Sequence, residues 1–439
     1  MKKKYRIILY TSIFLLCVVA SIILVVKKSN SVYEEESKPK VVKHKSMLSM
    51  NLEQTAGSGD YKTVTQSSWP TEGYKFNAEL SKCENGSTLS WDDTKKAVIM
   101  QGNVSDKCYV YFDIWIPSIA DYCTSGTDLA TCVKNFGDQG PSVSNIYIHN
   151  SSLTNGAGDN SYRYAGANPN NFVCFGSDAS PCPIDNLYRI IGVFGENYHG
   201  ANGKQLVKLI KYDYMTTDEL GTDGDYSQTY KEWGMDSTYK GTYGDGERIG
   251  VYYWNYKATG SATNTWSTSL LNKTNLNTNF INNIGTTWAN KIATVTWKVG
   301  GNTWANIGTK TSSVAYTNEI TNPVTTNTTD NATTYSAKIG LMYVSDYGFA
   351  ASPDAWTLTM SSYNNTTTTN NNWMYMGLYE WTFSRRADFS YSAFSVVSVG
   401  GVRSYNVSDD YGVRASFSLE SSVSYVSGSG SMSDPIVIN

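Results

Sequence analysis

The residues with the clearest potential for chemistry lie in one segment, residues 377–414, which reads GLYEWTFSRRADFSYSAFSVVSVGGVRSYNVSDDYGVR. Glycoside hydrolases place two carboxylates around the scissile bond, and Glu380 could form such a pair with Asp346 or Asp388. That pairing rests on residue type alone. Nucleophilic catalysis needs a nucleophile beside a base, but the three histidines of the chain are widely separated. We therefore expect no enzyme and keep a glycoside hydrolase only as the third functional hypothesis.

We expect a structural role, in preference to a binding role, for Glu380, Trp381 and Arg414. The two charged side chains occur in segments with strand-forming composition, and a buried charge needs a partner. We expect a Glu380–Arg414 or Arg414–backbone network that stabilises the fold, with Trp381 packed beside it.

The polar stretches between these strands form the candidate recognition surface. Tyrosine and arginine are frequent anchors of binding interfaces, and the chain contains 33 tyrosines. The candidate ligand-binding residues are Arg385, Arg386, Asp388, Phe389, Tyr391, Tyr405, Asp409, Asp410 and Tyr411. We expect their side chains to be exposed together, above a buried Trp381 and buried strands at 395–402 and 412–419.

Charge and composition also bear on metals and nucleic acid. The formal net charge is −3, so we expect no nucleic-acid partner. No cysteine couple has CxxC spacing and the histidines are dispersed, which argues against zinc. The acidic turns at 223–225 and 245–247 could offer oxygen ligands to Ca²⁺, although such sequences more often form simple turns. We therefore expect no metal and no cofactor.

The cysteines indicate disulfides. Apart from Cys17, they form three couples that are close in sequence, and sequential pairing is the simplest connectivity. The expected disulfide residues are Cys83 with Cys108, Cys123 with Cys132, and Cys174 with Cys182. Disulfides persist outside the cytosol.

The N-terminus suggests a membrane anchor. Residues 7–26 are apolar and follow the basic sequence MKKKYR. A run of this length can cross a bilayer as a helix, and a basic head favours a cytoplasmic N-terminus. We expect residues 1–28 to form a cytoplasmic tip and a transmembrane helix. The protein would then be a single-pass cell-membrane protein with an extracellular C-terminal domain.

The rest of the chain divides by composition. Residues 29–58 are expected to be a flexible tether, residues 59–115 a small antiparallel β module stapled by a disulfide, and residues 116–160 a connector. A large domain should occupy 161–439, with a Thr/Asn-rich surface insertion near 310–335.

Two elements of the large domain have strong local signals. Residues 186–215 read as a β-hairpin, with apolar runs on either side of a polar, glycine-containing loop. Residues 265–285 place apolar side chains near helical spacing, and Gly285 suits the end of a helix.

Several motifs resemble a known fold family. The order GLYEWT, VVSVGG and GVR is similar to that of the formylglycine-generating-enzyme-like, or sulfatase-modifying-factor, branch of the C-type-lectin-like fold. More closely, four stretches resemble uncharacterised bacterial surface proteins with such a domain, and residues 74–113 resemble the small cysteine-stapled module that often precedes it. The four stretches are Ser161–Phe194, Ile339–Gly348, Glu380–Thr382 and Gly412–Arg414. The resemblance implies an α+β fold.

The sequence also departs from that family. The oxidising enzymes of this branch need late reactive cysteines, and no cysteine follows Cys182. The sugar-binding tripeptides of calcium-dependent lectins are missing too. We therefore expect a membrane-anchored, adhesin-like binding protein that recognises a glycan or protein ligand. A structural cell-envelope protein is the alternative.

Overall fold

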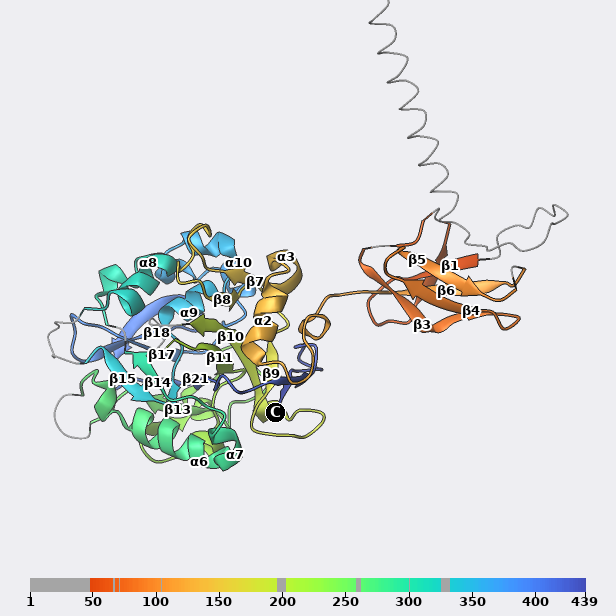
Figure 1. Cartoon of the computed structure of the whole chain (residues 1–439). Helices are drawn as coiled ribbons and strands as arrows, with labels where there is room; N and C mark the ends of the chain where they lie inside the picture. Colours follow the sequence, from red (N-terminus) through yellow and green to blue (C-terminus); the bar gives the residue numbers. More distant parts are fainter. Residues whose placement is uncertain are drawn as a thin grey trace, which may run out of the picture. The chain divides into compact units, whose positions relative to one another are not determined.

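The computed structural model describes residues 48–65, 68–70, 72–103, 105–195, 203–257, 262–299, 301–324 and 332–439. The chain forms two compact units, divided between Ile116 and Pro117. Strands dominate both units, and the helices are short (Figure 1). The predicted α+β class was therefore wrong. The described chain is mostly β-sheet, because the segments between its strands form turns and helices of only a few residues.

The predicted transmembrane helix, residues 7–26, lies outside the described residues, as does most of the predicted tether. Within the part of the chain that the structure describes, no helix combines the length and the apolar character needed to cross a bilayer. The predictions of a membrane-spanning helix and of a single-pass cell-membrane location are corrected on this finding.

The first unit contains a four-stranded sheet and a separate hairpin. The sheet has the order β2-β1-β6-β3, and β4 pairs with β5. The strands are β1 (Leu48–Glu53), β2 (Tyr61–Val64), β3 (Tyr74–Cys83), β4 (Thr88–Asp92), β5 (Ala97–Gln101) and β6 (Cys108–Ile114).

Alternation along β6 explains the core of this unit. Val110 and Phe112 are fully buried on one face, while their neighbours in the strand are partly exposed. Strand β1 runs parallel to β6 and places Leu52 opposite Phe112, so the sheet is mixed and not purely antiparallel as predicted. The sheet therefore begins at Leu48, within the segment that the sequence assigned to the tether.

The predicted disulfide pairing is confirmed. Bonds join Cys83 to Cys108, Cys123 to Cys132, and Cys174 to Cys182. The first bond links directly opposed residues of β3 and β6, so it crosses the sheet of the first unit.

The second unit is built around a seven-stranded sheet with the order β16-β21-β11-β10-β8-β7, in which β9 also pairs with β10. The strands are β7 (Ile146–Ile148), β8 (Tyr162–Tyr164), β9 (Phe172–Cys174), β10 (Leu187–Gly195), β11 (Gln205–Lys211), β16 (Ile339–Gly340) and β21 (Ser416–Ser418). Strand β10 is buried along almost its whole length, which explains its nearly continuous apolar sequence.

A six-stranded sheet with the order β12-β13-β20-β17-β18-β19 completes this unit. Its strands are β12 (Tyr226–Thr229), β13 (Gly250–Tyr253), β17 (Glu380–Arg385), β18 (Ser392–Val396), β19 (Val402–Asn406) and β20 (Asp410–Gly412). Two small hairpins pair β14 (Val295–Lys298) with β15 (Thr334–Ala337), and β22 (Tyr425–Ser427) with β23 (Val437–Ile438). The candidate residues lie on this six-stranded sheet or in the loops between its strands.

The helices of the second unit are short and surround these sheets. They are α2 (Leu129–Gly137), α3 (Pro141–Ser144), α4 (Thr217–Leu220), α5 (Tyr230–Trp233), α6 (Ile281–Asn283), α7 (Gly285–Ala289), α8 (Ser312–Tyr316), α9 (Val344–Phe349) and α10 (Thr366–Asn370). Short 3-10 turns occur at Ile119–Asp121, Ile184–Asn186, Trp266–Thr268, Trp304–Asn306, Pro353–Thr357 and Met360–Ser362, and π-helical turns at Leu271–Phe280 and Thr317–Thr321. Helix α2 contacts β10 and β11 (Figure 1).

The two strongest local predictions are confirmed. Strands β10 and β11 form the expected antiparallel hairpin. The expected helix is present as a π-helical stretch, Leu271–Phe280, followed by α6. Gly285 has a φ of 76°, which ends α6 before α7 begins, because this left-handed conformation costs glycine little.

The Thr/Asn-rich insertion differs from the prediction. Residues 312–321 form α8 and a π-helical turn, and Tyr316 and Ile320 are buried in the core. These apolar residues are separated by four positions, which places them on one face of a helix. The surface excursion expected for the whole of 310–335 was therefore wrong for its first part. The connector likewise contributes α2 and β7 to the second unit.

Candidate functional site

The buried charged pair of this region joins Glu380, the first residue of β17, to Arg414, which follows β20. Glu380 is 2% exposed and Arg414 is 1% exposed. Arg414 donates from Nε and Nη2 to the two carboxylate oxygens of Glu380, at 2.8 and 3.0 Å, and from Nη2 to the carbonyl oxygen of Met374 at 2.6 Å. Burial raises the pKa of Glu380, and the guanidinium of Arg414 opposes that rise. The expected ion pair is therefore present and fully enclosed.

Trp381 lies beneath the candidate surface. Its side chain is fully buried, and its indole N–H donates to the carbonyl oxygen of Tyr252 at 2.8 Å. Its ring lies 4.6 Å from the ring of Tyr411, measured between centroids. The expected burial of Trp381 and of residues 412–419 is confirmed. In the other predicted strand, Val399 is 51% exposed, because it occupies the turn between β18 and β19.

Four of the candidate residues gather in the loop between β17 and β18. Arg386 forms a bidentate ion pair with Asp388, with N–O distances of 2.9 and 2.6 Å. The guanidinium of Arg386 lies 4.0 Å from the ring centroid of Phe389, and Phe389 packs edge-on against Tyr391. Phe389 is 40% exposed and Tyr391 is 45% exposed. This loop therefore presents two aromatic rings to solvent.

Arg385 ends β17, and the remaining four candidate residues lie around the turn between β19 and β20. Tyr405 and Tyr411 have ring centroids 5.4 Å apart, and both contact Tyr379 and each other. Trp233, at the end of α5, lies 5.5 Å from Tyr379 and 6.4 Å from Tyr411. We call Trp233, Tyr379, Tyr405 and Tyr411 the aromatic cluster.

The two loops adjoin each other. The backbone N–H of Val407 donates to the carbonyl oxygen of Tyr391 at 2.9 Å. Arg386 also reaches across and donates to the hydroxyl of Ser404 on β19 at 3.2 Å. The Arg386–Tyr391 loop and the turn beside the aromatic cluster therefore belong to one continuous face of the second unit.

Two of the candidate residues are buried, so their predicted exposure was wrong. Arg385 is fully buried because β17 extends to this position and pairs it with Ala393. Its guanidinium lies over the backbone of Gly301. Tyr411 is 6% exposed because it lies on β20 and packs on Trp381. The polar composition around both residues predicted loops, whereas both residues lie in paired strands of the sheet.

Two of the three acidic candidates, Asp409 and Asp410, lie beside the aromatic cluster and have internal partners. A carboxylate oxygen of Asp409 accepts the backbone N–H of Asn406 at 3.1 Å, and one of Asp410 accepts the side-chain amide of Gln228 at 3.2 Å. Burial raises the pKa of Asp409. Tyr405 is half-buried, with its ring turned toward the cluster.

Trp233 and Tyr379 were missed by the sequence reasoning. Tyr379 precedes β17 and is two residues before Trp381, so alternation from Trp381 could have indicated that both pack on Tyr411. Trp233 had no such signal, because α5 is far away in sequence. Helix α5 is fastened by the hydroxyl of Tyr230, which donates to the carbonyl oxygen of Tyr379. Trp233 is 37% exposed and forms the outer edge of the cluster.

The acidic turns considered for calcium have internal partners. Asp225 is buried, and its carboxylate accepts the backbone N–H groups of Tyr256 and Leu271 at 3.1 and 2.8 Å. In the second turn, Asp245 and Glu247 both form ion pairs with Lys231.

In the described residues, cysteine and carboxylate ligand atoms gather at Cys83, Asp106 and Cys108. The two cysteines there form a disulfide, so their sulfur atoms are not thiolate ligands. The carboxylate of Asp106 accepts the backbone N–H groups of Asn85 and Ser87 at 2.8 and 3.1 Å. This group therefore stabilises a turn.

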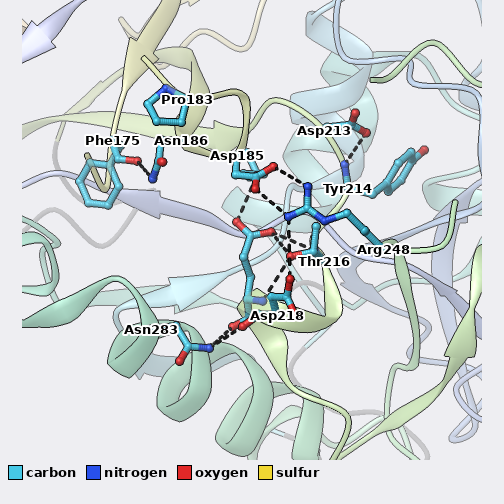
Figure 2. A network of polar contacts seen from close by, with 12 residues as sticks. Phe175, Pro183, Asp185, Asn186, Asp213, Tyr214, Thr216, Asp218, Arg248 and Asn283 are labelled. Carbon is cyan, nitrogen blue, oxygen red and sulfur yellow. Dashed lines mark hydrogen bonds and ion pairs between the residues drawn. The ribbon is translucent and has the colours of Figure 1, made fainter. Parts of the chain in front are cut away.

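Figure 2 shows a further polar network, near α4. Arg248 donates to both oxygens of Asp185, at 3.3 and 2.7 Å, and its Nη2 lies 3.9 Å from a carboxylate oxygen of Asp218. Asn283 donates to the backbone oxygen of Asp218 at 2.8 Å. The side chain of Arg248 is 45% exposed, so each ion pair contributes about 0–1 kcal/mol. The network fastens neighbouring loops to one another.

No family model matches this chain, and neither does any curated protein or any solved structure. The resemblance to the lectin-like family therefore stays a prediction from the motifs. The site presents exposed and half-buried aromatic rings, one paired arginine and carboxylates that already have partners, which suits binding by stacking and hydrogen bonding.

Proposed function

We propose that the protein is a non-catalytic recognition protein that binds a glycan across the aromatic cluster. The observation that carries this proposal is the convergence of Trp233, Tyr379, Tyr405 and Tyr411 from three separate segments onto one partly exposed face. A sugar ring alternates apolar C–H faces with hydroxyl groups. Tyrosine and tryptophan complement it, because each combines a broad apolar ring with a polar group and has little conformational entropy to lose.

The support for the cluster is rigid, which favours recognition. Trp381 lies beneath Tyr411, and the hydroxyl of Tyr230 attaches α5 to Tyr379, just before β17. Rings that are already held in place lose little freedom when a ligand binds. The Arg386–Tyr391 loop borders the cluster and adds the exposed rings of Phe389 and Tyr391.

A glycan array with purified protein tests the proposal. The variants Trp233→Ala and Tyr405→Ala should weaken binding to any glycan that the wild type retains by at least about tenfold, since a central aromatic anchor is worth about 2 kcal/mol or more. Tyr256→Ala is the matched control, because Tyr256 is 47% exposed and stacks on Tyr253 outside the cluster. The proposal fails if no glycan is retained, or if the cluster variants bind as well as the control.

A further inference from the structure

A cavity of about 210 Å³ in the second unit has no role in the proposed function. Its apolar walls are aromatic and include Phe172, Tyr212, Trp373 and Tyr375. Its polar groups include the cations Arg189 and Lys240, and no aspartate or glutamate lines it.

Arg189 carries an unbalanced charge at the wall of this cavity. It is 4% exposed, and its guanidinium is held between two rings, 4.3 Å from the centroid of Phe172 and 4.7 Å from that of Trp373. Its hydrogen-bond acceptors are all neutral. They are the side-chain oxygens of Asn168 and Asn171 and the backbone oxygens of Pro169 and Trp373. Burial lowers the pKa of Arg189 to about 9.

Two other buried arginines of this unit are neutralised by carboxylates. Arg163 pairs with Asp159 and Asp346, and Arg414 pairs with Glu380. Among the described residues, Arg189 forms no ion pair, and its Nη1 group makes a single hydrogen bond, to the carbonyl oxygen of Trp373. A buried cation without an anion is costly, unless a ligand supplies the negative charge.

Lys240 contributes the second positive charge. Its ammonium group donates to the backbone oxygen of Thr369 at 3.1 Å and to the side-chain oxygen of Asn370 at 3.5 Å, and it lies 4.6 Å from the ring centroid of Tyr375. Within the described part of the chain, it too has no carboxylate partner. The residue as a whole is exposed, so a ligand in the cavity can reach this group from solvent.

The remaining lining indicates which kind of anion would fit. Asn168, Asn370 and Asn372 line the cavity, and an amide side chain can both donate to and accept from sugar hydroxyls. Peptide carboxylates are often captured by free backbone N–H groups. Here several backbone N–H groups of the lining already donate to protein oxygens. They belong to Phe172, Tyr212, Lys240, Trp373 and Tyr375.

We propose that this cavity binds a single acidic sugar residue, with its carboxylate at Arg189 and Lys240 and its ring against the aromatic wall. The volume is many times the roughly 10–15 Å³ that a single water needs, so the cavity has room for a group of monosaccharide size. The cavity is distinct from the aromatic cluster, and its occupancy does not depend on the glycan proposed there.

Calorimetric titration of the whole protein with glucuronic acid and with N-acetylneuraminic acid tests this site. We expect at least one of the two acids to bind, and its methyl ester to bind at least about tenfold more weakly, because hydrogen bonds to a charged group are worth about 1.5–3 kcal/mol. Lys240→Gln should weaken binding of the acid by about three- to tenfold. Lys204 is another exposed lysine, and Lys204→Gln should leave the affinity for the acid unchanged. Arg189→Gln should abolish binding.

Arg189 also supports the fold, so the thermal unfolding of Arg189→Gln must be measured alongside. If that variant unfolds, the ester comparison and Lys240→Gln still decide the matter, because neither depends on removing a buried group. Equal affinity for acid and ester would overturn the proposal. So would the absence of any acidic-sugar binding, including a result in which only N-acetyl amino acids bind, which would indicate a peptide carboxylate instead. A loss of binding in Tyr405→Ala would also contradict a separate site.

Discussion

Replacement of Trp381 by alanine should destabilise the second unit without removing any exposed ring of the candidate surface. Trp381 is fully buried, packs on Tyr411 and donates to the carbonyl oxygen of Tyr252 at 2.8 Å. Truncation of a buried tryptophan to alanine costs about 3–5 kcal/mol. The carbonyl of Tyr252 would also lose its donor, which places the expected cost at the upper end of that range.

Two further variants separate the contribution of the buried ring contacts from that of the hydrogen bond and of exposed rings. Trp381→Phe keeps most of the ring contacts and loses the hydrogen bond, so we expect a cost of about 1–3 kcal/mol. Tyr391→Ala removes a ring that is 45% exposed, so its free energy of unfolding should stay within about 0.5 kcal/mol of the wild type. The same Tyr391→Ala variant, and Arg386→Ala, should lose affinity if their loop takes part in binding.

The assay is urea unfolding followed by near-ultraviolet circular dichroism, with the transition of the second unit fitted separately, because a chain with two units need not unfold in one step. If Trp381→Ala and Tyr391→Ala lower the free energy of unfolding by the same amount, the separation between a buried scaffold and an exposed binding loop is wrong. The loop would then be part of the scaffold, and this face would no longer be a candidate binding surface.

Three further predictions concern charges and cysteines. Arg414→Met should cost about 3–5 kcal/mol by leaving Glu380 buried without its partner, and adding Glu380→Gln should recover part of that loss in the same urea assay; no recovery would contradict the pairing. Burial raises the pKa of Glu319 from 4.5 to about 7, so the folded protein holds a proton that the unfolded chain releases. The wild type should therefore lose about 3 kcal/mol of stability, relative to Glu319→Gln, as the pH rises from about 4.5 to about 7. If the free energies of unfolding of the two proteins change with pH in parallel, this prediction is refuted. In unreduced, denatured protein, thiol titration should detect only Cys17, and further thiols would contradict the disulfides.

The sequence predicted the features that depend on neighbouring residues. The β10–β11 hairpin follows from two apolar runs around a polar loop, and the disulfides follow from cysteines that are close in sequence. The ion pair of Glu380 with Arg414 followed from the need to neutralise a buried charge. In each case the signal lies within a few residues or within a simple rule of charge.

The features that the sequence did not predict depend on distant contacts. Trp233 joins the aromatic cluster because α5 is bonded to Tyr379, just before β17, and nothing around Trp233 indicates that partner. Arg385 reads as part of a polar loop, yet pairing with β18 buries it. Arg189 lies in an apolar strand, and its lack of a carboxylate becomes visible only when the neighbouring loops are placed around it. Alternation and turn composition carry no information about such pairings.

A crystal structure of the protein with the glycan that it retains most strongly tests the central claim most directly. We predict that one sugar ring lies against Trp233 and Tyr405, with its apolar face toward the indole. A glycan bound elsewhere on the chain, with both of these rings still open to solvent, would contradict the account.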